Sequence, residues 1–229
     1  MKLTSEQIER LYQFTRQHYV EYYDLQTELV DHLANGIETQ WEQNPNLSFE
    51  EALQIEFKKF GIFGFTSVVE QRQETLTKKY DQLVWQHFKD FFKLPKIIGS
   101  LVAIVLLKLF LEKISFLEEL IITSFIAMLL TFFAGMVYLQ YKNRRKTRAS
   151  GKKWLFEKVI FSNGSFVGYI YVVMCVFNKV PRHFESDYAI WFFSIMIVLM
   201  ALLEYIMLVK IPKKSEEYLI ATYPEYKLT

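Results

Sequence analysis

Three polar side chains interrupt long apolar stretches in the second half of the chain: Glu204, Asn163 and Lys108. A polar group inside a membrane helix is costly, so it is by default a candidate for binding an ion or a substrate. Glu204 lies about one and a half turns from the end of its stretch, where contact with the membrane interface is the simpler interpretation. Lys108 lies about one turn from the end of its stretch, where a long side chain can extend to the headgroups. We treat the three as a candidate intramembrane polar site.

A dense basic segment follows the second apolar stretch. Seven of its cations are candidate contacts for lipid headgroups: Lys142, Arg144, Arg145, Lys146, Arg148, Lys152 and Lys153. Anionic lipids of the cytoplasmic leaflet attract such segments. The segment could equally serve only to fix orientation, because basic loops stay in the cytoplasm. Direct binding of nucleic acid is not expected, since no recognition fold surrounds these residues.

No catalytic or cofactor-binding motif accompanies these residues. The sequence contains no H-E-x-x-H, no phosphate-binding glycine loop, no G-x-G-x-x-G and no G-x-S-x-G. Glu28 and His32 are four residues apart and can form a surface pair on one helix face, but no third metal ligand follows at helical spacing. Cys175 is the single cysteine, which excludes an internal disulfide. We therefore predict a protein that is not an enzyme and needs no cofactor or metal.

The apolar stretches are long enough to predict membrane-spanning helices between residues 94 and 211. A span needs roughly 20 apolar residues to cross a hydrocarbon core about 30 Å thick. We expect four spans, at about 97–111, 120–141, 159–180 and 188–209. The first is short by this criterion and could instead be a buried or interfacial helix.

The distribution of charge predicts the orientation. Residues 1–96 carry 11 Lys/Arg and 15 Asp/Glu, whereas residues 97–229 carry 16 and 10. Basic clusters precede the first span, follow the second and follow the fourth, so an even number of spans places all of them in the cytoplasm. We expect a multi-pass protein of the cytoplasmic (inner) membrane with both termini in the cytoplasm, residues 212–229 forming a cytoplasmic tail.

Residues 1–93 predict a cytoplasmic domain of four helices. Capping boxes at Thr4–Gln7, Ser48–Glu51 and Ser67–Glu70 would begin the first, third and fourth helices, with Thr66 as an alternative start of the fourth. An apolar residue recurs every four positions of the second helix: Leu25, Leu29, Leu33, Ile37 and Trp41. Gly61 is the expected end of the third helix, and we expect the apolar turn 61–65 to pack under the bundle. The fourth helix, ending near residue 93, could continue into the first span.

Several short motifs in this domain follow a pattern known from bacterial proteins. They are Glu28-Leu29-Val30-Asp31-His32-Leu33, Ile37-Glu38, Ser48-Phe49-Glu50-Glu51-Ala52-Leu53 and Phe60-Gly61. Together they resemble the helix-turn-helix-associated α-helical signalling domain found at the N-termini of small bacterial membrane proteins. The resemblance covers roughly residues 5–90. It implies a partnership with a small transcriptional regulator of the PadR-like type, with the membrane bundle as sensor or anchor.

The sequence thus predicts an all-α fold, with a cytoplasmic four-helix domain followed by a four-helix transmembrane bundle. The expected function is a membrane-anchored signalling or interaction protein that binds a partner through residues 1–93. The alternative is a small transporter or permease-like subunit that uses the polar groups of its bundle. A membrane-embedded enzyme acting on lipid is the weakest possibility, because acids and histidines do not cluster at one membrane depth. Self-association is also plausible, since so small a bundle leaves little room for a private channel.

Overall fold

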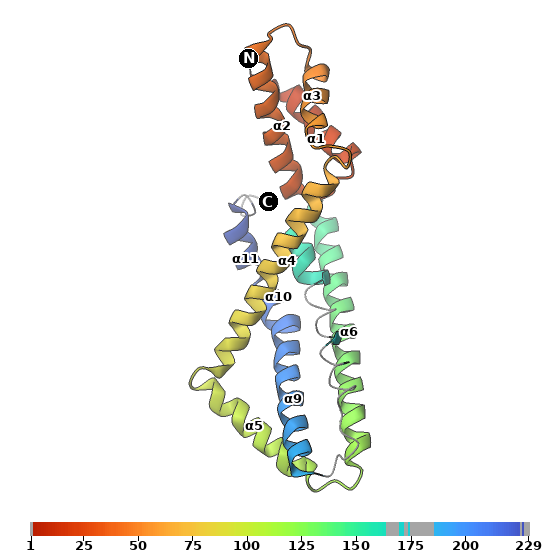
Figure 1. Ribbon diagram of the computed structural model, residues 1–229, viewed down its shortest axis with the longest axis vertical. Coiled ribbons are helices and arrows are strands. Elements are labelled where there is room, and N and C mark those ends of the chain that lie inside the picture. The colour runs from red at the N-terminus through yellow and green to blue at the C-terminus, as the bar shows by residue number, and fades with distance from the viewer. Residues whose placement is uncertain (1, 164–169, 172–173, 175–185, 225, 227–229) are drawn as a thin grey trace.

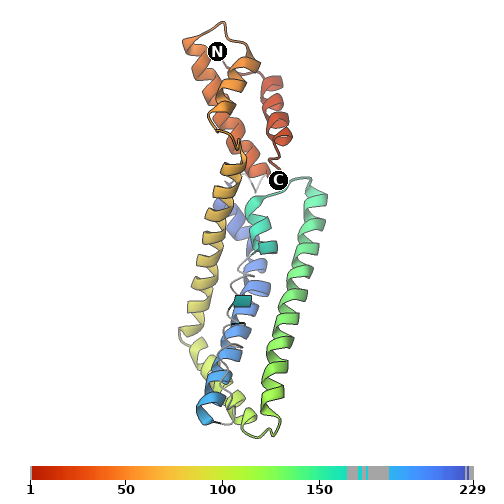
Figure 2. The same cartoon turned by 45° about the vertical axis from the view of Figure 1, so that its right-hand side comes forward.

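A computed structural model of the chain describes residues 2–163, 170–171, 174, 186–224 and 226. Every regular element in these residues is helical. The molecule is elongated, with three short-to-medium helices at one end and long helices running to the other end in both views (Figures 1 and 2). We call the first group, α1 to α3 with the turn that follows, the head.

The head contains α1 (Ser5–Gln17), α2 (Tyr23–Gln43) and α3 (Phe49–Lys58). The predicted capping boxes of α1 and α3 are both confirmed: the Thr4 hydroxyl accepts from the Gln7 amide at 3.3 Å, and the Ser48 hydroxyl accepts from the Glu51 amide at 3.3 Å. These contacts satisfy amides that a helix start leaves without intrahelical partners.

The apolar stripe of α2 forms the centre of the head core. All five of its predicted members are buried. Aromatic rings from the other helices close the core, with Phe57 lying 5.1 Å from Phe14 and 5.0 Å from Phe65 between ring centroids. The head therefore follows the periodicity of its sequence.

The turn between α3 and α4 departs from two predictions. Helix α3 ends at Lys58, three residues before Gly61, and Gly61 has the left-handed backbone expected of a stop, at φ 75°. However, the predicted Ser67–Glu70 capping box is wrong, because α4 begins at Thr66 with Phe65 as its N-cap residue. The Ser67 hydroxyl instead donates to the Gly64 carbonyl at 3.3 Å. The turn packs inward only through Phe65, whereas Ile62 is 100% exposed and Phe63 is 76% exposed. A five-residue turn can point only some of its side chains at the core.

The fourth helix, α4 (Thr66–Lys89), is followed by the short η1 (Asp90–Phe92) and by α5 (Lys96–Leu111). The axes of this helix pair differ by 79°, so the predicted continuation of one into the other is wrong. Proline explains the break, because it lacks an amide hydrogen and disfavours a helical conformation in the residue before it. At about 1.5 Å per residue, α5 is about 24 Å long, which is shorter than the hydrocarbon core.

The remaining elements are α6 (Leu117–Ser150), α7 (Leu155–Lys158), η2 (Val159–Asn163), α9 (Asp187–Tyr205), η3 (Ile206–Lys210), α10 (Ile211–Lys213) and α11 (Ser215–Thr222). Among the described residues, α6 and the continuous run Asp187–Lys213 are long and apolar enough to cross a membrane, and the bent α4–α5 pair brings the number to three if it forms one broken span. The predicted spans 120–141 and 188–209 lie within the two long helices. Most of the predicted span 159–180 lies outside the described residues.

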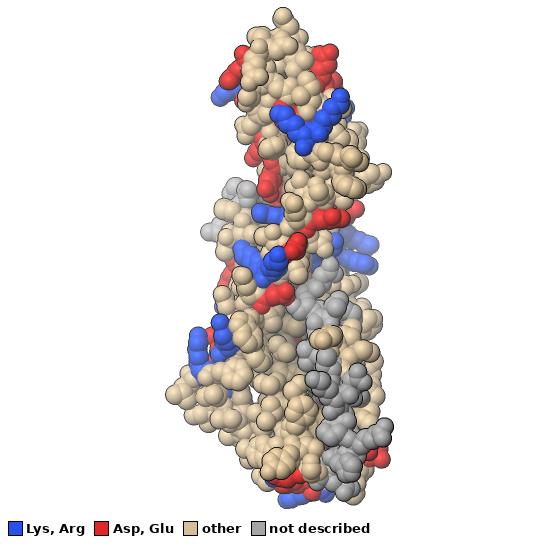
Figure 3. All heavy atoms as spheres, viewed as in Figure 1, with Lys and Arg blue, Asp and Glu red and all other residues tan. Residues whose placement is uncertain are grey.

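The helix α4 belongs to the bundle as much as to the head, because it packs against α7, η2, α9 and η3. The segment predicted as a tail also packs on it. The Lys79 ammonium donates to the Thr222 hydroxyl at 2.9 Å, His87 Nε2 lies 2.6 Å from the Tyr218 hydroxyl, and Leu219 is fully buried. Most charged side chains on the face in Figure 3 lie around the head and the upper bundle, leaving a largely uncharged lower region.

Candidate functional site

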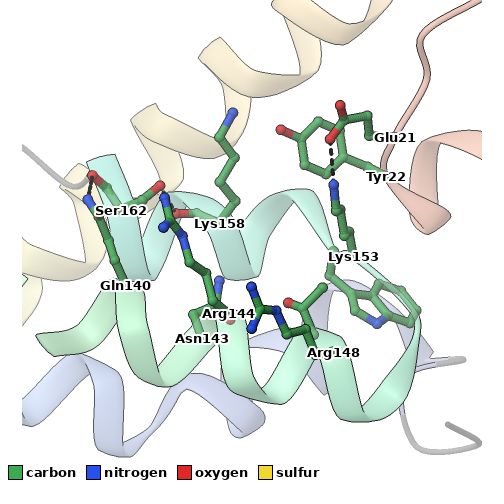
Figure 4. Close-up of a pocket in the computed structure, with 11 residues that line it drawn as sticks. Glu21, Tyr22, Gln140, Asn143, Arg144, Arg148, Lys153, Lys158 and Ser162 are labelled. Atoms are coloured by element: carbon green, nitrogen blue, oxygen red, sulfur yellow. Dashed lines mark hydrogen bonds and ion pairs between the residues drawn. The ribbon is translucent and has the colours of Figure 1, made fainter. Parts of the chain in front are cut away.

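A hollow of about 490 Å³ lies beside the C-terminal turns of α6, and four cations line it. Arg144 and Arg148 come from α6, Lys153 from the loop after it, and Lys158 from α7. Figure 4 shows these side chains gathered around the same space, with Glu21 and Tyr22 of the α1–α2 turn at its edge. We call this hollow the basic pocket.

The basic pocket keeps an excess of positive charge. Glu21 is the single carboxylate among the described residues that line it. Within the described part of the chain, Arg144 and Arg148 form no ion pair. Neutral hydrogen-bonding groups complete the lining: Gln140, Asn143, Thr147 and Ser162. Such a combination suits an anion with several oxygen acceptors.

Glu21 and Lys153 form the ion pair at the edge of the pocket, with 2.7 Å between the ammonium and the carboxylate. The hydrogen bond and charge of Lys153 lower the pKa of Glu21, and the charge of Lys158 adds to this effect. Both side chains are more than half exposed, so the pair contributes at most about 1 kcal/mol to stability. Lys153 can therefore exchange Glu21 for another anion at low energetic cost.

Beside the pocket, a joint ties the head to α7. The Tyr23 amide donates to the Lys153 carbonyl at 2.7 Å, and the Leu155 amide donates to the Asp24 carboxylate at 3.1 Å. The buried Trp154 ring lies between two other rings, 5.4 Å from Tyr23 and 5.4 Å from Tyr223. The joint therefore connects the start of α2, the loop before α7 and the C-terminal segment.

Asp24 is the buried acid of this joint. Burial raises the pKa of its carboxyl, and this effect is opposed by the Tyr223 hydroxyl and by the Leu155 amide. In the sequence, Asp24 marks only the start of α2, where an acid is favoured by the helix dipole. Its partner is 131 residues away, so no spacing within the sequence could have identified the contact.

The predicted lipid contact Lys146 lies in a different environment from the arginines of the pocket. Its ammonium is 2.9 Å from the Glu157 carboxylate and 3.8 Å from Glu216, and it donates to the Tyr226 hydroxyl at 2.5 Å. The Glu157 side chain is only 3% exposed. Lys146 thus neutralises a buried acid.

The other predicted lipid contacts lie outside the basic pocket. The Lys152 ammonium is 4.3 Å from the centre of the Tyr23 ring, a cation–π contact at the joint. Lys142 and Arg145 are exposed on α6 and do not line the pocket. Of the seven predicted cations, the structure brings three into the pocket and adds Lys158.

The residues of the candidate intramembrane site do not converge. Lys108 pairs with Glu112 and, at 3.1 Å, with Asp187 at the start of α9. Glu204 is half-buried on the same helix, 17 residues further on, which is about 25 Å along a helix axis. Asn163 ends η2, and its side chain lies outside the described residues.

The predicted surface pair of Glu28 and His32 is wrong. Glu28 lies 3.9 Å from Arg72 of α4, and the His32 ring lies 5.5 Å from the Phe60 ring. Each side chain finds a partner on a neighbouring element, which the spacing along one helix could not reveal. In the described part of the chain, no group of three or more His, Cys, Asp or Glu residues could hold a metal ion.

The chain was compared with protein-family models, with curated proteins and with solved structures. None of the family models, curated proteins or solved structures matches it.

Proposed function

We propose that this protein is a membrane-anchored interaction protein whose head captures a cytoplasmic protein partner. The observation that carries the proposal is a set of exposed apolar side chains on the head: Tyr19 at 91%, Phe63 at 76% and Ile62 at 100% exposure. We call these three residues the head patch. Large apolar side chains exposed on one small domain favour an interaction surface, and aromatic residues often supply most of the binding energy there.

The members of the head patch flank one aromatic cluster. His18, next to Tyr19, has its ring 4.4 Å from the Phe57 ring and 5.9 Å from the Phe65 ring. Phe65 closes the turn that contains Ile62 and Phe63. The two segments that carry the head patch are therefore joined through packed rings, of which Phe65 is buried and His18 and Phe57 are half-buried.

Tyr19 has a backbone conformation that favours glycine. It follows α1 with φ 64°, and the Val20 and Tyr19 amides donate to Thr15 and Arg16 carbonyls, both at 3.1 Å. This is the Schellman pattern, in which the left-handed position is usually glycine. A tyrosine there costs on the order of 1 kcal/mol, while its side chain is almost entirely exposed. A role in binding would explain why so costly a residue occupies the position.

The resemblance of residues 5–90 to the helix-turn-helix-associated signalling domain suggests the kind of partner. We propose a small transcriptional regulator of the PadR-like type, held at the cytoplasmic side of the inner membrane. The proposed topology has four spans with both termini in the cytoplasm. In its support, α6 and α9 run in the same direction (Figures 1 and 2), as expected if another crossing separates them.

The alternative function, a small transporter, requires polar side chains that share a path through the bundle. Lys108 contacts Asp187 at the start of α9, and Glu204 lies 17 residues further along that helix, about 25 Å away along its axis. Lys108 is also already paired with two acids. We therefore favour the interaction protein. Self-association remains a prediction, for which the exposed apolar side chains of α5 offer one surface.

The test is in-cell crosslinking of the full chain followed by affinity purification and mass spectrometry. Capture of a PadR-like regulator by the natural sequence, and its loss in an Ile62→Ser/Phe63→Ser variant, is the expected result. The matched control is Phe92→Ser/Leu94→Ser, which removes two exposed apolar side chains at the α4–α5 break. Equal capture by the head variant and the control would overturn the proposal.

A further inference from the structure

The basic pocket lies where the apolar surface of α6 gives way to charge. Residues three and four apart lie on one helix face. Seven residues of α6 follow this spacing: Ile126, Leu130, Phe133, Val137, Tyr141, Arg144 and Arg148. All seven are exposed. A single face of α6 therefore offers an apolar track that ends directly at two arginines.

Aromatic side chains mark the level of the membrane interface on this helix. Tyr138 and Tyr141 are exposed one to two turns before the arginines. Tyrosine is enriched at the boundary between hydrocarbon and headgroups, because its ring is apolar and its hydroxyl is wet. The pocket then lies at headgroup depth, while the apolar track lies at the depth of the acyl chains.

The lining of the pocket suits a phosphate group. Arginine forms paired hydrogen bonds with phosphate oxygens, and Arg144 and Arg148 are one turn apart with no acid paired to them in the described chain. Lys153 and Lys158 line the same hollow, where Lys153 pairs with Glu21 and the Lys158 ammonium lies 5.2 Å from the centre of the Tyr22 ring. A volume of about 490 Å³ is within the range of small-molecule sites. Four cations disfavour a headgroup that carries its own positive charge, such as choline.

We propose that the basic pocket binds the phosphate of an anionic phospholipid from the cytoplasmic leaflet, with the acyl chains lying along the exposed face of α6. Basic pockets on the cytoplasmic side of membrane helices bind anionic headgroups by this chemistry. The proposal goes beyond the protein-binding function and does not depend on it, because the pocket and the head patch share no residue.

The test measures lipid binding to the purified full chain in a neutral detergent. Native mass spectra recorded during titration give apparent dissociation constants for phosphatidylglycerol and phosphatidylcholine. We expect phosphatidylglycerol to bind more tightly. In Arg144→Gln/Arg148→Gln its dissociation constant should rise at least about tenfold, because the variant loses the charged hydrogen bonds that both guanidinium groups would donate to the phosphate.

The control variant is Lys142→Gln/Arg145→Gln, which removes the same charge from the same turns of α6 but outside the pocket. We expect it to bind phosphatidylglycerol within about twofold of the natural sequence. Equal weakening in the two double variants would overturn the proposal in favour of diffuse attraction between a basic segment and an anionic surface.

Two further measurements complete the test: a competition experiment identifies the source of the phosphate, and a variant at Lys158 tests the part of the pocket that α7 supplies. Glycerol 3-phosphate should compete poorly, because it lacks acyl chains; competition at the affinity of phosphatidylglycerol would overturn the lipid assignment and indicate a soluble phosphate ester. Lys158→Gln, which approaches from α7, should also weaken phosphatidylglycerol binding, and unchanged affinity in this correctly folded variant would count against the pocket.

Discussion

The head patch and the basic pocket offer two kinds of surface. The head exposes Tyr19, Ile62 and Phe63 over an aromatic cluster, whereas the pocket gathers Arg144, Arg148 and other cations around a polar hollow. Apolar burial depends little on salt, while exposed charges are screened over a Debye length of about 10 Å at 0.1 M salt. The comparison teaches that one small chain carries an apolar surface and a basic hollow at separate places, and that binding at the two would respond differently to salt.

The largest expected effect is on stability and concerns Lys146, which lies outside the basic pocket and pairs with Glu157. Lys146→Ala leaves the Glu157 carboxylate, 3% exposed, without its partner, and loss of one partner of a buried pair costs about 3 kcal/mol. Thermal unfolding of the purified protein measures this change. Arg145→Ala, on the exposed side of α6, should change stability by less than about 0.5 kcal/mol. Similar effects of both substitutions would remove the distinction between structural and binding cations.

Substitutions of Asp24 test the joint that connects the head to α7. Asp24→Ala leaves the buried Leu155 amide without its acceptor, which costs about 1–3 kcal/mol. Asp24→Asn keeps an oxygen at that position and should cost less. If Asn is as damaging as Ala in denaturant titrations, the carboxylate charge, and not the hydrogen bond, holds the head on α7.

Asp24 also predicts a pH dependence. Because burial raises its pKa, the folded protein keeps this proton to a higher pH than the unfolded chain, whose carboxyl has a pKa of about 3.9. The folded state binds more protons in that window, so the contribution of Asp24 to stability falls as pH rises from the unfolded pKa through the folded one. Unfolding measured across this range should lose that slope in Asp24→Asn; an unchanged slope would assign it to other groups.

Substitutions of Tyr19 should have a smaller effect on stability, and they separate that effect from the effect on partner binding. Tyr19→Gly should raise the free energy of unfolding by about 1 kcal/mol, because glycine adopts the left-handed backbone at φ 64° without strain. The same variant should lose capture of the partner. Tyr19→Ala removes the ring but keeps the strain, so it should lose capture without gaining stability. A Tyr19→Gly protein that is no more stable would show that the tyrosine is not strained.

The smallest expected effect on stability lies at the edge of the pocket. Glu21→Gln removes an exposed ion pair with Lys153, which should change the free energy of unfolding by less than about 1 kcal/mol. Because it frees a cation, it should tighten binding of phosphatidylglycerol, opposite in sign to Arg144→Gln. Weaker lipid binding in Glu21→Gln would mean that Glu21 positions Lys153 instead of competing for it.

Patterns among neighbouring residues predict the helices and the core of the head. They do not predict contacts between segments that are far apart in the sequence. The capping boxes at Thr4 and Ser48 and the buried stripe of α2 follow from contacts within a few residues. The basic segment was identified as a candidate surface, but its division between Arg144 in the pocket and Lys146 beside Glu157 depends on the packing of α7 against α6. Asp24 was missed because its role depends on a contact across 131 residues. Lys158 is the last cation of the same basic segment, and its place in the pocket depends on the packing of α7.

The joint around Trp154 has a consequence for the order in which the chain is built. Its ring lies between Tyr23, which is synthesised before α7, and Tyr223, which is synthesised after it. Domains generally begin to fold during synthesis, N-terminal parts first, so the head can form its core while α7 and α11 are still unmade. The head can then contact the loop before α7 as soon as that loop is made, but completion of the joint must wait for the segment after α11. A ribosome that stops before residue 215 would release a chain whose joint is open on one side.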